Sequence, residues 1–202
     1  MYLNKTQLAI IYGSIMGDSY LQNNGTNVRL RFEHSLAQEE YLIWKFNSLK
    51  RIFSLTSIIK LNRIHPLTKR EYKYIRCQSK TLPELRTIKE VFYKDDKKIV
   101  PADLKNYIAK PVSLAVWFMD DGYYYKRDKC GYLYLGNVVK KEALICQEVL
   151  KNNFGLETKV LSKKKGYALY FSRLEMLKLK KIISKHIIPL FKYKIPIDPV
   201  TT

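Results

Sequence analysis

Two short apolar segments that end in carboxylates lie about half a chain apart, and they hold the residues best suited to chemistry. The first, residues 11–19, reads IYGSIMGDS and contains Asp18, and the second, residues 114–122, reads LAVWFMDDG and contains Asp121. An apolar helix buries itself, so a charge in its last turn is either solvated at the rim or held there for chemistry. Aspartate is also unfavourable at a helix C-terminus, where it faces the negative end of the helix dipole. Acids at the same point of two such segments therefore predict a pair of carboxylates that work together.

Paired carboxylates in a basic chain indicate a metal-dependent reaction on a polyanion. Two carboxylates a few ångströms apart repel each other unless a divalent cation lies between them. A hard cation such as Mg²⁺ prefers oxygen ligands and accepts phosphate oxygens among them. The formal net charge of +19 favours a nucleic acid as the substrate. The predicted reaction is phosphodiester hydrolysis, although a single aspartate at a helix end is usually only a solvated terminus. Asp120 is expected to support Asp121 or to offer its backbone carbonyl.

Composition limits the class of protein. Residues 1–101 carry 18 Lys and Arg against 9 acids, and the remainder carries 19 against 9, so the positive charge is spread over both halves. A hydrophobic content of 47% is enough for a packed core, and no apolar run approaches the ~18 residues of a membrane-spanning helix. Three cysteines without metal-binding or redox spacing are expected to be reduced thiols: Cys77, Cys130 and Cys146.

The elements that must position these acids follow one order twice, as helix, two strands, helix, two strands, helix. This order predicts an α+β fold made of two αββαββα repeats, with boundaries at 1–101 and 102–202. In the first half, helices are expected over 7–18, capped by Thr6, and over 37–52 and 81–93, with strands at 27–33, 57–64 and 72–78. In the second half, helices are expected up to 121 and over 140–153 and 173–186, with strands at 123–127, 132–137, 157–163 and 167–172.

Each repeat is expected to cover one face of an antiparallel sheet with helices and leave the other face open. Period-two alternation in the strands predicts that basic and aromatic residues gather on the open faces. Two such faces side by side would form a long positive saddle for nucleic acid. The residues assigned to it are Arg29, Arg31, Lys60, Arg63, Lys73 and Arg76 in the first half, and Tyr123, Tyr125, Arg127, Lys159 and Lys163 in the second.

Small residues predict that the two motif helices pack closely on each other. Gly13 and Gly17 are four apart and so lie on one helix face, as do Ala115 and Met119 in the second motif. Three further polar residues are candidates for the chemistry. Lys98 and Lys194 each precede a proline at the end of a repeat, where an ammonium group could stabilise the charged transition state or polarise water. Gln78, near the end of a strand, could orient a water molecule.

The two acidic segments resemble the signature motifs of the single-chain LAGLIDADG homing endonucleases, with the monomeric, intron-encoded omega-type branch the most similar. Residues 113–122 carry the more specific match, and the resemblance extends from Leu8 to the Lys-Ile-Pro near the end of the chain. It implies metal binding by Asp18 and Asp121, helped by the backbone carbonyls of Gly17 and Asp120. It also implies active-site roles for Lys98 and Lys194, and two sheets that straddle DNA. The motifs depart from the family pattern at Ser19, which replaces a glycine, and at Val116, which replaces a small residue.

The resemblance implies a site-specific endonuclease that cuts both strands of a long asymmetric DNA target and leaves short 3′ overhangs. We expect Mg²⁺ as the cofactor, with Mn²⁺ able to substitute and Ca²⁺ able to bind without supporting cleavage. Double-stranded DNA is the expected partner of a monomer, with the chain's own intron RNA as a further candidate. The alternatives are an intron RNA maturase on the same fold and a DNA-binding regulator without cleavage. The expected compartment is an organelle in which the protein is made, or a bacterial or archaeal cytoplasm, without secretion or a membrane.

Overall fold

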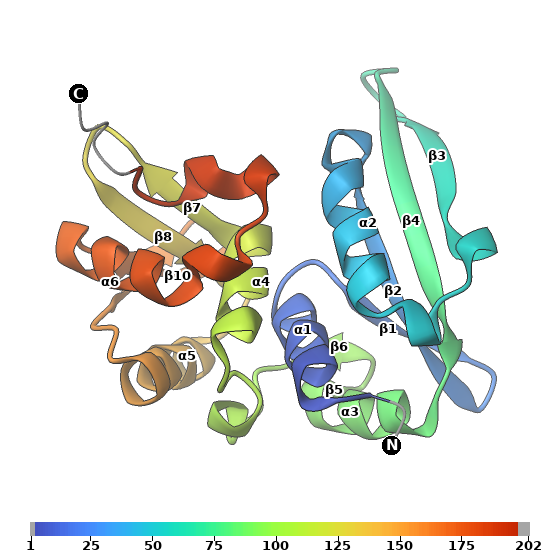
Figure 1. Ribbon diagram of the computed structural model, residues 1–202, viewed down its shortest axis with the longest axis horizontal. Coiled ribbons are helices and arrows are strands. Elements are labelled where there is room, and N and C mark those ends of the chain that lie inside the picture. The colour runs from blue at the N-terminus through green and yellow to red at the C-terminus, as the bar shows by residue number, and fades with distance from the viewer. Residues whose placement is uncertain (1–2, 198–202) are drawn as a thin grey trace. The chain divides into compact units, whose positions relative to one another are not determined.

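The computed structural model describes residues 3–197, and its elements follow the expected order in the first half of the chain (Figure 1). The helices and strands there are α1 (Lys5–Met16), β1 (Tyr20–Asn24), β2 (Asn27–Ser35), α2 (Glu39–Ser48), β3 (Ile59–Ile64), β4 (Glu71–Thr81) and α3 (Pro83–Phe92). A short hairpin of β5 (Tyr93–Lys94) and β6 (Lys97–Lys98) follows.

The second half repeats this order. Its elements are α4 (Pro111–Asp121), β7 (Gly122–Tyr125), β8 (Cys130–Tyr134), α5 (Lys140–Phe154), β9 (Lys159–Lys163), β10 (Gly166–Phe171) and α6 (Arg173–Ile183). The strands form two four-stranded antiparallel sheets, in the orders β1-β2-β4-β3 and β7-β8-β10-β9. The predicted tandem α+β repeat with antiparallel sheets is therefore confirmed.

The chain folds as two compact units that differ from the two sequence repeats. The N-terminal unit holds the residues up to Leu8 together with Asp18–Val91, and the C-terminal unit holds Ala9–Gly17 together with Phe92 onward. Most of the first motif helix therefore belongs with the second repeat in space. The repeat boundary at Pro101 stays a prediction about sequence, and each unit is described below by itself.

The N-terminal sheet has one covered face, and strand alternation explains it. In β2, Val28, Leu30, Phe32 and His34 are buried, while the residues between them are half-buried. Helix α2 contacts β2 and β4 on the covered side (Figure 1). Its Lys45 is fully buried, with Nζ 3.3 Å from Nε2 of His34 and 4.2 Å from the centre of the Tyr41 ring. The ring face and the imidazole nitrogen stabilise this ammonium group away from water.

The start of α1 differs from the prediction in its cap. Asn4, not Thr6, caps the helix, because Oδ1 of Asn4 accepts hydrogen bonds from the backbone N–H groups of Thr6 and Gln7, each at 2.9 Å. The side chain of Gln7 accepts in return from the N–H of Asn4 at 3.0 Å. This reciprocal pair is a capping box, in which asparagine serves at least as well as threonine.

The C-terminal sheet packs against α5 and α6, and α6 also contacts α4 (Figure 1). Helix α4 is the most buried helix of this unit, with every residue from Val112 to Met119 inside. Its continuous apolar sequence explains this, because a helix that is apolar on all sides needs neighbours all round. Within residues 3–197, no helix is both long and apolar enough to cross a membrane.

Candidate active site

The close approach predicted for the first motif helix is present in the C-terminal unit. A side chain at Gly13 would clash with the backbone carbonyl of Ser113 and would lie 3.0 Å from Cβ of Val116. A side chain at Gly17 would clash with that of Asp120. The first motif helix therefore contacts α4 through Ser113, Val116 and Asp120. Because Gly13 has no side chain, the bulkier Val116 fits where the family pattern has a small residue.

Both lysines singled out from the sequence bind backbone carbonyls at the ends of the motif segments. Nζ of Lys98 donates to the carbonyl oxygen of Gly17 at 2.7 Å. Nζ of Lys194 donates to the carbonyl oxygens of Met119 at 2.6 Å and Asp120 at 3.2 Å. The last carbonyls of a helix have no partner within the helix, so these ammonium groups satisfy them and complement the negative end of the dipole.

The two lysines differ in their exposure to solvent. Lys98 is exposed at the end of β6, in a hairpin whose turn residues Asp95 and Asp96 have φ angles of 50° and 57°. Two successive positive φ values are typical of the type I′ turn, whose twist matches that of the paired strands. Lys194 is buried, with Nζ 5.0 Å from the centre of the Phe191 ring. Lys98 is therefore at the surface, whereas Lys194 is part of the core.

The two predicted acids lie in different settings. Asp121 is the last residue of α4 and is half-buried in the C-terminal unit. Asp18 is exposed, in the turn between α1 and β1. In the N-terminal unit, a carboxylate oxygen of Asp18 and a ring nitrogen of His34 lie within 4.8 Å of each other. His34 is not among the site residues predicted from the sequence.

His34 is a buried neutral base beside the Asp18 carboxylate. Burial and the nearby Lys45 ammonium lower the pKa of His34 to about 3, although the charge of Asp18 and a hydrogen bond with Gln38 partly oppose the shift. The signal in the sequence was the alternation of β2, which places position 34 on the covered face with Phe32. Its nearness to Asp18 depends on a turn that alternation does not describe.

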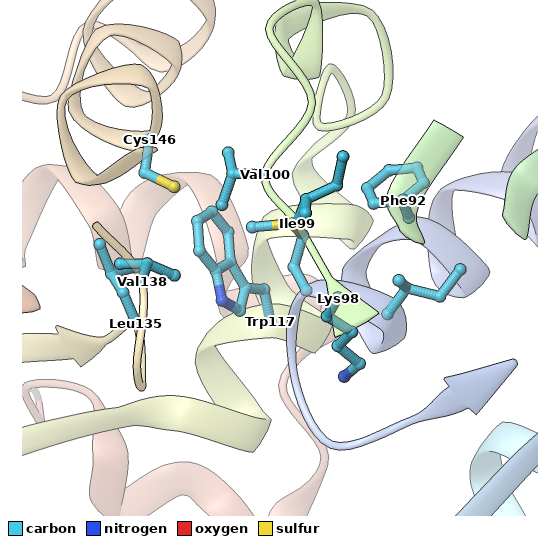
Figure 2. A pocket seen from close by; sticks show the side chains of 10 residues that line it. Phe92, Lys98, Ile99, Val100, Trp117, Leu135, Val138 and Cys146 are labelled. Carbon is cyan, nitrogen blue, oxygen red and sulfur yellow. The ribbon is translucent and has the colours of Figure 1, made fainter. Parts of the chain in front are cut away.

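Beneath Lys98 the C-terminal unit holds a small apolar pocket of about 70 Å³ (Figure 2). Trp117 of α4 stands between Val100 on one side and Leu135 and Val138 on the other, and the ammonium of Lys98 points away from these walls (Figure 2). Within the described part of the chain, the indole Nε1 of Trp117 is buried without a hydrogen-bond partner. Ile15 and Met16 of α1 also line this pocket, so apolar side chains of both motif helices lie close to the lysine.

The N-terminal sheet carries a charged open face, but two of the predicted residues do not lie on it. Lys60 of β3 is directly opposite Ile75 of β4, and Lys73 is two residues from Ile75 on β4. Both therefore lie on the covered face, where Ile75 is buried, and their predicted placement is wrong. Lys60 also forms an ion pair at 3.1 Å with Glu39 of α2, the helix that packs on the covered face. Lys73 and Arg76 are an odd number of residues apart, and period-two alternation puts such residues on opposite faces.

The remaining predicted residues of the N-terminal sheet do share the open face. Arg31, Glu33, Arg63 and Arg76 form one ion cluster there, with the arginines around the single glutamate. Beside it, Oε1 of Gln22 accepts from Nε of Arg29 and from Nε2 of Gln78, each at 3.2 Å. Gln78 thus lies inside β4, among residues that could contact bases, and the predicted role in orienting a water stays untested.

The C-terminal sheet presents tyrosines instead of arginines. The strand register places five tyrosines with Lys159 and Lys163 on its open face, namely Tyr123, Tyr125, Tyr132, Tyr134 and Tyr170. Nζ of Lys163 lies 4.1 Å from the centre of the Tyr132 ring. Arg127 is in the turn between β7 and β8, where its side chain is 93% exposed and paired with Asp128 at 2.9 Å. The two open faces therefore offer different chemistry.

The chain is similar to known endonucleases and maturases over almost all of its length. It is 27% identical to the cytochrome b mRNA maturase bI2 of Saccharomyces cerevisiae over 96% of its residues, but spans only 48% of that relative. It is 23% identical to the DNA endonuclease I-ChuI of Chlamydomonas applanata, over 96% of both chains.

The fold has a solved counterpart in the homing endonuclease I-WcaI bound to its DNA recognition sequence. The TM-score is 0.89 at 24% identity, and the match covers 98% of this chain and 89% of the other. The family model of the LAGLIDADG DNA endonucleases matches residues 8–179. This range contains both motifs, both acids and most of the repeated αββαββα order, and the chain belongs to the LAGLIDADG DNA endonuclease family.

Proposed function

We propose that the chain is a site-specific homing endonuclease that makes a double-strand break in a long, asymmetric DNA target. The observation that carries this proposal is the same arrangement at the end of both motif segments. In each, an acid is preceded by a residue whose backbone carbonyl accepts a hydrogen bond from a lysine. Asp18 follows Gly17, whose carbonyl binds Lys98, and Asp121 follows Asp120, whose carbonyl binds Lys194. A family member that had only kept the fold would not need both sets.

The oxygen atoms at the motif ends suit a hard divalent cation. The carboxylates of Asp18 and Asp121 and the carbonyls of Gly17 and Asp120 are the donors that Mg²⁺ prefers. Each of these carbonyl oxygens accepts from a lysine and retains a second lone pair. When bound, Mg²⁺ would activate the attacking water and stabilise the leaving 3′ oxygen. We expect Mn²⁺ to substitute, and Ca²⁺ to bind without supporting cleavage.

The chain's own residues would supply charge and position. Lys98, exposed and held by a tight hairpin, is suited to approach a scissile phosphate and to stabilise its charge in the transition state. Lys194, buried against α4, is suited to fix the backbone around Asp121. We propose that the product has short 3′ overhangs and that the protein acts as a monomer, since it contains both motifs itself.

The experiment that tests the proposal is cleavage of a pooled duplex library, including intron-insertion sites from AT-rich genomes. The proposal predicts one long asymmetric site, cut in Mg²⁺ and bound but uncut in Ca²⁺. Sequencing of the cut ends then gives the overhang. Specific binding with no cut in Mg²⁺ or Mn²⁺ would contradict the nuclease and favour a DNA-binding protein.

A second candidate function is that of an intron RNA maturase. It is favoured by the similarity to a cytochrome b mRNA maturase, which covers 96% of this chain. The tyrosine-rich face of the C-terminal sheet also suits RNA, because aromatic side chains stack on unpaired bases. A splicing assay on the intron that encodes the chain tests it, and protein-dependent splicing by an Asp121→Asn variant would separate this activity from cleavage.

A further inference from the structure

Glu33 lies at the centre of the charged cluster on the open face of the N-terminal sheet, and it contacts three arginines from three strands. Its Oε2 atom is 2.6 Å from Nη2 of Arg31 and 2.6 Å from Nε of Arg76, and its Oε1 atom is 2.6 Å from Nη2 of Arg63. These contacts link β2, β3 and β4. One carboxylate thus sets the positions of three guanidinium groups.

The strand register shows why the cluster forms. Glu33 and Arg76 are opposite each other in the β2–β4 pair, and Arg31 is two residues from Glu33 on the same face. Arg63 comes from β3, opposite Tyr72, and its guanidinium carbon lies 4.8 Å from the centre of the Tyr74 ring. Arg63 is therefore held both by the carboxylate and by an aromatic ring.

The cluster is neither core nor free surface. The side chains of Glu33 and Arg76 are each 18% exposed, that of Arg31 is 25% exposed, and that of Arg63 is 47% exposed. The guanidinium groups are therefore pressed against the sheet but remain within reach of a partner on the open face. A guanidinium has five N–H donors, and the ion pair with Glu33 accounts for one donor of each arginine.

Charge explains what the glutamate contributes. Three guanidinium groups around one point repel each other, and without the carboxylate they would extend away from the sheet, where they would meet phosphates. Phosphate contacts give affinity without sequence preference, whereas an arginine held over a base edge can bind guanine O6 and N7 together. The position of the guanidinium thus decides which of the two contacts it makes.

We propose that Glu33 is a positioning residue for target specificity: it holds Arg31, Arg63 and Arg76 over base edges, so that this half of the target is read through guanines. This inference rests on the proposed function, since it assigns how the same face reads duplex DNA. The guanine preference would apply to one half-site only, because the open face of the C-terminal sheet carries tyrosines instead of arginines.

The test compares Glu33→Gln with Glu39→Gln in the full chain. Both variants remove one negative charge, but Glu39 pairs with Lys60 on the helix side of the sheet. Binding is measured in Ca²⁺, to the duplex that the wild-type chain selects from a random library and to an unrelated duplex. Glu33→Gln is expected to bind the unrelated duplex more tightly, to depend more steeply on salt, and to lose about tenfold or more in the ratio of the two affinities. Glu39→Gln is expected to retain the ratio.

The outcomes separate the inference from the proposed function. If the wild-type chain selects a site but both variants keep the wild-type ratio, the inference is overturned while the proposed function stands. If only one base preference changes in Glu33→Gln, Glu33 reads that base itself and does not position the arginines. If the wild-type chain selects no duplex at all, the proposed function fails and the inference fails with it.

A second variant covers a loss of folding in Glu33→Gln. The side chain of Arg63 is the most exposed of the four, so Arg63→Gln should leave the fold intact. It is expected to lose roughly 5- to 150-fold in discrimination at one guanine of the N-terminal half-site and to keep the preferences of the other half. Equal weakening on all duplexes would mean a phosphate contact and would overturn the inference.

Discussion

Gly13 of the first motif helix lies against the backbone of Ser113 in α4, so closely that no side chain fits between them. A backbone carbonyl cannot rotate away as a side chain can, so this contact fixes the spacing of the motif segments in the C-terminal unit. The ends of both segments, with Gly17 beside Asp120, depend on that spacing.

Replacement of Gly13 by alanine should therefore destabilise the protein. Overpacking a tight contact costs about 1–3 kcal/mol, and here the obstacle is the carbonyl of Ser113. Chemical denaturation measures the free energy of unfolding. The matched control is Thr6→Ala, an exposed position on the same helix, which should change stability by less than about 0.5 kcal/mol. Equal stabilities for the two variants would show that the helices have room to separate.

Replacement of the two lysines should have different effects on the stability of the protein but the same effect on cleavage. Lys194→Met removes the buried donor to the carbonyls of Met119 and Asp120, and a buried acceptor left without a partner costs about 1–3 kcal/mol. Lys98→Met removes an exposed donor and should cost less than about 0.5 kcal/mol. Single-turnover cleavage should be slowed by both changes. A wild-type rate in Lys98→Met would remove that lysine from the proposed chemistry.

The ion cluster around Glu33 should make stability depend on pH in the acid range. Burial alone would raise the pKa of Glu33, but hydrogen bonds from Arg31, Arg76 and Arg63 outweigh it and lower the pKa to about 2, from an ordinary value of 4.5. A lowered pKa means that the stabilisation is fully present above about pH 4.5 and is lost as the pH falls towards 2.

Unfolding by urea at pH 6 and at pH 3 measures this dependence. The stability difference between the wild-type chain and Glu33→Gln should be larger at pH 6 than at pH 3. Glu39→Gln is the control, because its carboxylate is 42% exposed and its ion pair with Lys60 should contribute little at either pH. A difference for Glu33→Gln that does not change with pH would contradict the cluster.

The three cysteines should be unreactive in the folded chain. Cys77, Cys130 and Cys146 are buried free thiols, and burial raises the pKa of each, to about 12 for Cys77. The thiolate is the reactive form, so a raised pKa and poor access both slow modification. Ellman's reagent at pH 8 should detect almost no thiol in the native protein and three per chain in denaturant. Rapid reaction of the native protein would show that one of the thiols is accessible.

Much of this organisation was predictable from sequence because it depends on periodicity. The tandem αββαββα order follows from helix and strand patterns, and the buried α4 follows from its apolar run. The placement of Lys60 and Lys73 was wrong because each is three residues from the arginine of its own strand, Arg63 or Arg76, and so lies on the opposite face of the sheet.

Contacts between segments distant in sequence could not be predicted from periodicity. The hydrogen bonds from Lys98 to Gly17 and from Lys194 to Met119 join residues 81 and 75 positions apart. The cluster at Glu33 needs the register of three strands, and one of its residues lies 43 positions along the chain. The spacing of Gly13 and Gly17 predicted close packing of the motif helices, but it did not predict that most of α1 belongs to the C-terminal unit.

Whether the two motif acids carry out the cleavage is tested by measuring cleavage of the selected duplex by Asp18→Asn and Asp121→Asn, with Asp128→Asn as a control. Asp128 lies outside both motifs, in the exposed turn before β8 where it pairs with Arg127, and its loss should leave the cleavage rate unchanged. The two motif variants are expected to bind the duplex in Ca²⁺ with near wild-type affinity and to cut neither strand in Mg²⁺. Cleavage of both strands at the wild-type rate by either motif variant would contradict this role of the acids.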